Sequence, residues 1–136
     1  MADVILDDHV LKETARWLVH AREDYDQALR MRNQSLRHCC FWANQSAEKA
    51  IKSIFVFLRL AVPKTDDLDE LVQALPDGWM VKGHSGNLSA LNRWPQESQY
   101  PDYSLTPSEA DADAAISLAE RVLSSVEEDL RAHGYS

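Results

Sequence analysis

The stretch that decides the fold is residues 40–52, which read Cys40-Phe41-Trp42-Ala43-Asn44-Gln45-Ser46-Ala47-Glu48-Lys49-Ala50-Ile51-Lys52. Apolar and small residues recur around it at intervals of three and four, the period of an α-helix with one buried face. We predict a helix over about residues 36–61. The small residues in the middle of its stripe would let another helix approach closely. Val62-Pro63 would end it, because the residue before a proline is disfavoured in helical geometry.

Helical signals also lie on both sides of this stretch. Residues 8–31 show the same spacing and predict a long first helix, and residues 67–75 predict a short third one. Residues 87–94 could add one or two turns. In the last helix we expect Thr106 as the N-cap, Pro107 at the first helical position, Glu109 as the capping-box residue and Gly134 after the final turn.

These segments together predict an all-α fold in one domain, residues 1–136. The expected architecture is an up-down four-helix bundle with a short extra helix and an irregular segment, residues 77–107, before the last helix. The longest apolar stretch, residues 51–62, is interrupted by Arg59 and is shorter than the roughly 18 residues of a membrane span. The acidic N-terminus does not resemble a secretory signal, and the adjacent Cys39 and Cys40 read as reduced thiols. We therefore expect a cytoplasmic protein with no membrane contact.

Charge divides the chain into two unequal halves. Residues 1–64 carry ten Lys and Arg against eight Asp and Glu, whereas residues 65–136 carry four against fourteen. The net charge of −8 excludes a general electrostatic affinity for nucleic acid. Any nucleotide or RNA contact is expected in the first half, where Arg30, Arg32 and Arg37 lie close in sequence; the alternative is that they are ordinary solvated residues.

The stretch from Cys40 to Lys52 resembles the signature of the HEPN domain family, in which a small residue and an aromatic precede Gln-x-Ala-Glu-Lys-Ala-x-Lys. Three other segments are similar to family features in the expected order: residues 21–28, Gln99-Tyr100-Pro101-Asp102, and residues 109–123. The resemblance implies a helical bundle, commonly a homodimer, encoded beside a minimal nucleotidyltransferase. Many such proteins are RNA-cleaving toxins or nucleotide-binding modules.

The chain departs from the family at two positions. The usual His-Asp-Leu before the third helix reads Asp66-Asp67-Leu68, and the arginine before Tyr-Pro-Asp is Gln99. HEPN ribonucleases use an arginine and, four to six residues later, a histidine in a late helix, and the late helices here offer no such pair. Arg32 and His38 have the spacing but lie at the first connection, so they are an alternative catalytic pair; the other interpretation is a polar helix start.

Candidate binding residues lie in the signature itself. We name Gln45, Glu48, Lys49, Lys52 and Tyr100 as nucleotide- or partner-binding residues. The competing interpretation is an intrahelical pair of Glu48 with Lys52, and aromatic residues that fill the core. We expect no metal, because adjacent helical residues such as Cys39 and Cys40 cannot converge on one ion, and no cofactor.

The leading hypothesis from the sequence is a non-catalytic HEPN-type binding module in a toxin–antitoxin-like context. It would be a homodimer that partners a minimal nucleotidyltransferase, binds a nucleotide, or both. The first alternative is a metal-independent ribonuclease toxin using Arg32 and His38, the only case in which RNA is a partner. The second is a purely structural helical adaptor.

Overall fold

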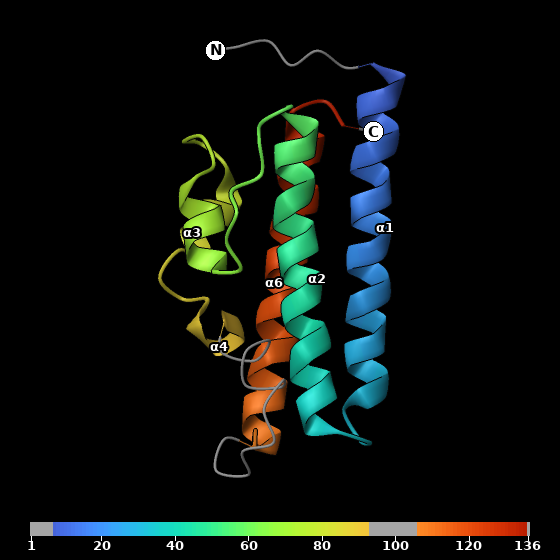
Figure 1. Ribbon diagram of the computed structural model, residues 1–136, viewed down its shortest axis with the longest axis vertical. Helices are drawn as coiled ribbons and strands as arrows, with labels where there is room; N and C mark the ends of the chain where they lie inside the picture. Colours follow the sequence, from blue (N-terminus) through green and yellow to red (C-terminus); the bar gives the residue numbers. More distant parts are fainter. Residues whose placement is uncertain (1–6, 93–105, 136) are drawn as a thin grey trace.

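The computed structural model describes residues 7–92 and 106–135, and the regular structure in them is entirely helical. Three helices are long: α1 (Asp8–Met31), α2 (Leu36–Phe57) and α6 (Glu109–Ala132). Between α2 and α6 lie α3 (Leu68–Gln73), the 3₁₀ helix η1 (Met80–His84) and α4 (Ser89–Asn92) (Figure 1). The predicted all-α fold is confirmed, with the first helix at the predicted bounds. No helix in the described ranges is both long and apolar enough to span a membrane.

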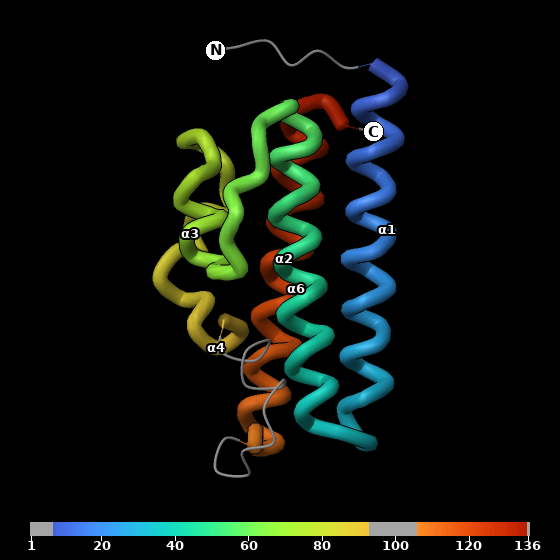
Figure 2. The backbone as a smooth tube through the Cα atoms, viewed as in Figure 1, coloured from blue at the N-terminus to red at the C-terminus, as the bar shows by residue number. Residues whose placement is uncertain are grey.

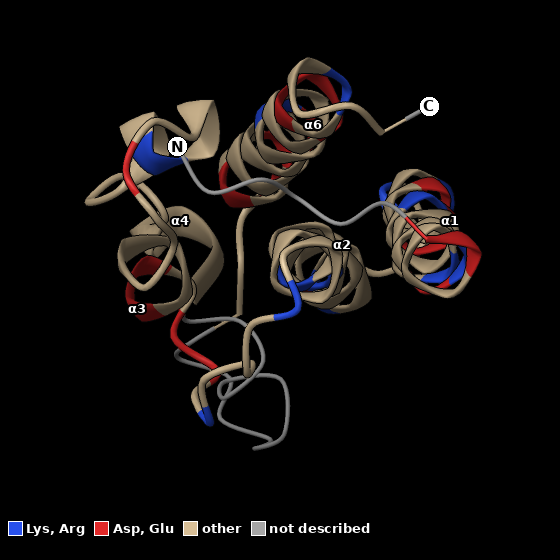
Figure 3. Ribbon diagram, turned by 90° about the horizontal axis from the view of Figure 1, so that it is seen from above, with Lys and Arg blue, Asp and Glu red and all other residues tan. Residues whose placement is uncertain are grey.

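The long helices run side by side, with α1 antiparallel to α2 and α6 parallel to it (Figure 2). The short helices lead the chain back along the bundle before α6 begins, so they occupy the fourth place of the up-down arrangement. Seen from above, α2 lies between α1 and the short helices, with α6 on one side of it (Figure 3). Helix α2 is therefore the central element, which is why its sequence decides the fold.

The core is built on the apolar stripe of α2. Ile51, Ile54 and Phe57 are fully buried, and α6 adds buried residues such as Val122. Each large aliphatic side chain removed from water contributes roughly 1.5–3 kcal/mol, so these residues dominate the stability of the bundle. The stripe of α1 is made partly of small residues that are fully buried, Ala21 and Ala28, which let α1 lie close to α2.

Helix α2 ends at Phe57, four residues before the predicted end at residue 61, so Pro63 is not the residue that terminates it. Its last turn closes with hydrogen bonds from Leu60 N to Phe55 O (2.9 Å) and from Arg59 N to Val56 O (3.1 Å). Arg59 adopts the left-handed conformation with φ of 58°, a place where glycine is common. The Arg59 side chain forms an ion pair with Asp7, the N-cap of α1. A glycine at this position could not tie the end of α2 to the start of α1.

The start of α6 also differs in detail from the prediction. Ser108, not Thr106, is the N-cap, and its hydroxyl accepts a hydrogen bond from Asp111 N at 3.0 Å. Asp111, not Glu109, completes the capping box, because its carboxylate accepts from Ser108 N at 2.9 Å. The predicted glycine at the other end is confirmed, since Gly134 has φ of 99°.

The short helices are held by side chains that satisfy backbone amides. Asp67 caps α3 through hydrogen bonds to Asp69 N and Glu70 N, and Leu68 beside it is fully buried. The carboxylate of Asp129 in α6 accepts from Met80 N at 2.7 Å and from Val81 N at 3.0 Å, which fixes η1 on α6. Asp67 and Leu68 of the Asp66-Asp67-Leu68 stretch thus stabilise the fold.

Candidate functional site

An ion pair joins the two segments of α1 and α2 that carry the sequence signature. Lys49 Nζ lies 2.5 Å from Asp24 Oδ2, and the Asp24 and Lys49 side chains are 11% and 26% exposed. One helical turn away, Ser46 Oγ donates to Ala21 O at 2.8 Å. Lys49, predicted as a binding residue, therefore has its ammonium held at a defined place at the boundary of the two helices.

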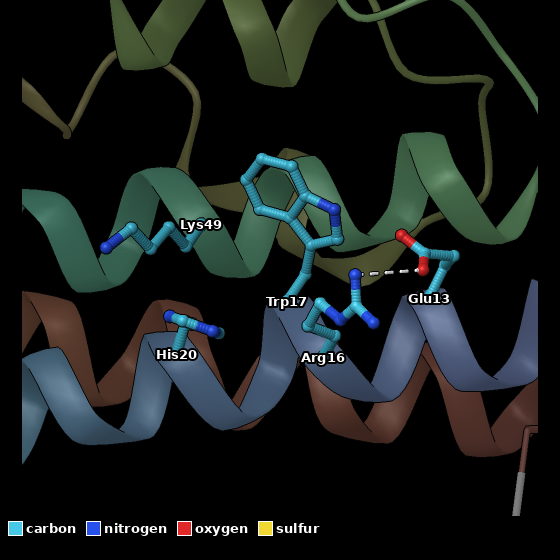
Figure 4. A pocket seen from close by; sticks show the side chains of 5 residues that line it. All are labelled: Glu13, Arg16, Trp17, His20 and Lys49. Carbon is cyan, nitrogen blue, oxygen red and sulfur yellow. Dashed lines mark ion pairs between the residues drawn. The ribbon is translucent and has the colours of Figure 1, made fainter.

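A pocket of about 320 Å³ lies beside this ion pair. One face of α1 supplies four of its lining residues at helical spacing, and α2 supplies the fifth (Figure 4): Glu13, Arg16, Trp17, His20 and Lys49. Residues three and four apart on a helix are neighbours on one face, so the first four form a continuous wall. The spacing on α1 and the packing of α1 on α2 together create the pocket.

Glu13 and its ion-pair partner Arg16 lie at one end of the pocket, and the basic side chains of His20 and Lys49 lie at the other. Figure 4 shows the Trp17 indole in the middle, with Glu13 on one side and with His20 and Lys49 on the other. Arg16 Nη1 lies 3.3 Å from Glu13 Oε1, but the Arg16 side chain is 69% exposed, so this pair is weakly held. The side chains of Trp17 and His20 form no hydrogen bond or ion pair within residues 7–92 and 106–135, so both are available to a ligand.

A second cavity of about 470 Å³ continues the groove toward the N-terminal end of α1. It shares Glu13 with the first pocket and is also lined by Asp7, His9, Val10, Val56 and Arg59. Asp7 and Arg59 pair with each other there, so the cavity has no cation in excess of its two acids. The first pocket instead has Arg16 and Lys49 against the one acid among its lining residues, Glu13.

The other predicted binding residues of α2 lie outside both cavities. Gln45 Nε2 donates to Asn44 Oδ1 at 3.2 Å. Lys52 Nζ lies 3.5 Å from Glu48 Oε2, which is the intrahelical pair given as the alternative. Their spacing places Gln45, Glu48 and Lys52 on one face of α2, where Glu48 and Lys52 are half-buried. Tyr100 lies outside the described residues.

The alternative catalytic residues have partners on different elements. The Arg32 guanidinium binds Asp113 of α6 through two bonds, Nε to Oδ1 at 2.7 Å and Nη2 to Oδ2 at 3.2 Å, and lies 3.5 Å from Glu109. These bonds raise the pKa of Arg32 and lower the pKa of Asp113. His38 Nδ1 is instead 2.8 Å from Ser35 Oγ, the N-cap of α2. Arg32 thus fastens the end of α1 to the start of α6.

The described residues bring together neither three metal-ligating side chains nor an exposed cysteine. No group of three His, Cys, Asp or Glu residues in these ranges could hold a metal ion. Cys39 and Cys40 are free and buried. Burial raises the pKa of the Cys39 thiol, which disfavours the reactive thiolate.

Of the residues that line the first pocket, only Lys49 was predicted from the sequence to bind a ligand or partner. Trp17 is half-buried and lies three residues after the buried Thr14 and four before the buried Ala21, so it continues the buried stripe of α1. His20 is exposed, and Asp24 was not predicted to be buried. A signal was available: Glu13, Arg16, Trp17 and His20 share one helical face, and a tryptophan among charged residues is unusual for a purely solvated surface.

Comparison with known proteins places this arrangement in a family. The profile of the HEPN domain matches residues 14–129, which include the Asp24–Lys49 pair and most of the first pocket. The chain belongs to the HEPN domain family. The crystal structure of TT1696 from Thermus thermophilus is similar, with a TM-score of 0.74, 25% identity and coverage of 86% of this chain and 98% of that one. No curated protein matches this HEPN chain.

Proposed function

We propose that this HEPN protein is a non-catalytic binding module for a nucleotide, which it holds in the pocket between α1 and α2. The observation that carries the proposal is an available indole, Trp17, next to the basic groups of His20 and Lys49 in a cavity of about 320 Å³. That volume is within the roughly 300–1,000 Å³ of small-molecule sites. A nucleobase can stack on the indole, and its phosphate can receive hydrogen bonds from the basic end.

The electrostatics of the pocket differ from those of the whole chain. The protein carries a net charge of −8, yet Arg16, His20 and Lys49 meet around one tryptophan. A lysine ammonium has three donors, and Asp24 takes one, so Lys49 keeps donors for a phosphate. The ion pair also holds the ammonium at the pocket edge, which lowers the entropy cost of ordering it when a ligand binds.

Isothermal titration calorimetry with nucleoside monophosphates at low salt tests this proposal. Stacking on an aromatic side chain is worth roughly 1–3 kcal/mol per base, so Trp17→Leu should weaken binding by about 5- to 150-fold. His20→Ala should weaken it as well, because the phosphate loses a donor. His38→Ala is the matched control, a histidine on a different helix and outside the pocket, and should bind like the wild type. Absence of nucleotide binding by the wild type would refute the proposal.

We also propose that the protein acts as a homodimer that partners a minimal nucleotidyltransferase in a toxin–antitoxin-like context. The support is the face of α2 that carries Phe41, Glu48 and Lys52, which are only half-buried in the single chain although they belong to the central helix. Light scattering coupled to size exclusion tests the homodimer, and co-purification with a nucleotidyltransferase encoded beside it tests the partner. A protein that stays monomeric at all concentrations would refute the first part.

The ribonuclease alternative is less well supported by the geometry. It needs the Arg32 guanidinium to hold a phosphate, but the guanidinium already forms two hydrogen bonds to the Asp113 carboxylate and lies near Glu109. RNA cleavage that resists EDTA and is lost in His38→Ala would restore that alternative.

A further inference from the structure

The ends of the first pocket make different demands on a ligand. Lys49 and His20 at one end are suited to an anion, whereas the carboxylate of Glu13 at the other end only accepts hydrogen bonds. From Glu13 to His20 is seven residues of α1, or about 10 Å at 1.5 Å per residue. A bound nucleotide with its phosphate at the basic end would therefore extend its base over Trp17 toward Glu13.

The nucleobases differ in what they present to a carboxylate. Guanine has two adjacent donors on its Watson–Crick edge, N1–H and the N2 amino group, which match the two oxygens of one carboxylate. Adenine and cytosine present one amino group next to a ring nitrogen that accepts, and uracil presents one N–H between two carbonyl oxygens. In these three cases an acceptor of the base faces an acceptor of the protein, which costs free energy once water is excluded.

We infer that the α1–α2 pocket selects guanine nucleotides, with Glu13 reading N1–H and the N2 amino group while Lys49 and His20 hold the phosphate. The inference rests on the proposed function and adds the identity of the base to it. Arg16 does not block this arrangement, because its side chain is 69% exposed and held to Glu13 only by a 3.3 Å ion pair at the surface. Displaced from one oxygen of Glu13, its guanidinium can turn to solvent.

Titration of the wild-type protein with GMP, IMP, AMP, CMP and UMP tests the selectivity. A good bidentate contact discriminates against the wrong base by roughly 5- to 150-fold, which is the expected advantage of GMP over AMP. IMP retains N1–H but lacks the N2 amino group, so its affinity should lie between those of GMP and AMP. Equal affinities for GMP and AMP would overturn the inference and leave nucleotide binding intact. Absence of binding by all five nucleotides would overturn both.

Variants locate the discrimination at Glu13. Glu13→Gln replaces one acceptor oxygen by a donor, so it should weaken GMP, strengthen AMP, and remove most of the difference between them. Glu23→Gln removes the same charge from an exposed position of α1 outside the pocket and should keep the wild-type ratio. Arg16→Gln should change the affinities for GMP and AMP by similar factors, so that the GMP-to-AMP affinity ratio changes little. A GMP preference that survives unchanged in Glu13→Gln would overturn the assignment to this residue.

Discussion

Asp24 and Asp129, the buried acidic residues in the described ranges, are satisfied in different ways. Asp129, 2% exposed, accepts hydrogen bonds from two backbone amides of η1. Asp24, 8% exposed, is paired with the Lys49 side chain at the edge of the open pocket. The amides around Asp129 and the ammonium of Lys49 each offset the cost of burying a carboxylate. Only the Asp24–Lys49 pair lies beside a pocket.

The contact of Asp129 with the η1 amides stabilises the fold, whereas the contact of Asp24 with Lys49 also positions a side chain of the pocket. Backbone amides cannot rotate away, so the bonds to Asp129 fix a turn that has few hydrogen bonds of its own. A lysine on a flexible stem can exchange one donor between Asp24 and a ligand. We therefore expect loss of Asp129 to act on stability alone, and loss of the Asp24–Lys49 pair to act on both stability and binding.

The largest effect is expected for Asp129→Ala. It leaves the amides of Met80 and Val81 without their acceptor, at a cost of roughly 1–3 kcal/mol each, so the free energy of unfolding should fall by about 2–6 kcal/mol. Urea denaturation followed by circular dichroism measures this fall. Asp129→Asn keeps one acceptor and should lose less, and Glu128→Ala, at an exposed neighbouring position, should lose little. A loss below about 1 kcal/mol in Asp129→Ala would show that water replaces the carboxylate.

A smaller effect is expected from breaking the Asp24–Lys49 pair. Lys49→Met leaves a nearly buried carboxylate without its partner, and we expect a loss of about 1–3 kcal/mol, because partial exposure softens the full penalty of an unpaired buried charge. The double variant Asp24→Asn/Lys49→Met should recover part of that loss, which a double-mutant cycle measures. Nucleotide affinity should fall in both variants, because both lack the ammonium. Additive losses in the cycle would mean that the two residues do not interact.

The sequence predicted the helices well because their signal is local. The apolar spacing of α1 predicted its observed bounds, and the same spacing predicted the start of α2 at Leu36. Helix ends were predicted less well, because several local patterns compete there. Arg59 closes α2 in a conformation more typical of glycine, and Ser108 takes the cap that Thr106 was expected to provide.

Most residues of the first pocket were not predicted from the sequence, because the pocket depends on the register of α1 against α2. Lys49 was named from the signature, but its partner Asp24 is 25 residues earlier in the chain. No periodic sequence pattern links residues that far apart. The pairing of Asp24 with Lys49 depends on the register of the two helices, which the hydrogen bond from Ser46 to Ala21 helps to set. Trp17 presents the same difficulty: it is a half-buried residue of the α1 stripe, and only the packing of α1 on α2 brings it into one pocket with Lys49.

Asp113 completes the comparison, because this carboxylate is exposed and paired with an arginine. The hydrogen bonds from Arg32 lower its pKa below the ordinary value of 3.8. A carboxylate with a lowered pKa in the folded state stabilises the protein above its unfolded pKa, and that contribution is lost as the pH falls through the folded value. Asp113→Asn should therefore lower Tm slightly near neutral pH, and the difference from the wild type should shrink below pH about 4.

Differential scanning fluorimetry from neutral to acidic pH measures this effect, which should be the smallest of the three because the Asp113 side chain is 64% exposed and solvent screens the pair. Asp66→Asn, which removes an exposed carboxylate just before α3, is the matched control and should leave Tm close to the wild-type value. Added salt should reduce the effect of Asp113→Asn, because exposed charges are screened, and should leave the loss in Asp129→Ala unchanged. If the Tm difference between Asp113→Asn and the wild type persisted at acidic pH, the substitution would remove more than the charge of the carboxylate. Asp113 would then resemble Asp129, a carboxylate whose geometry matters more than its ionisation.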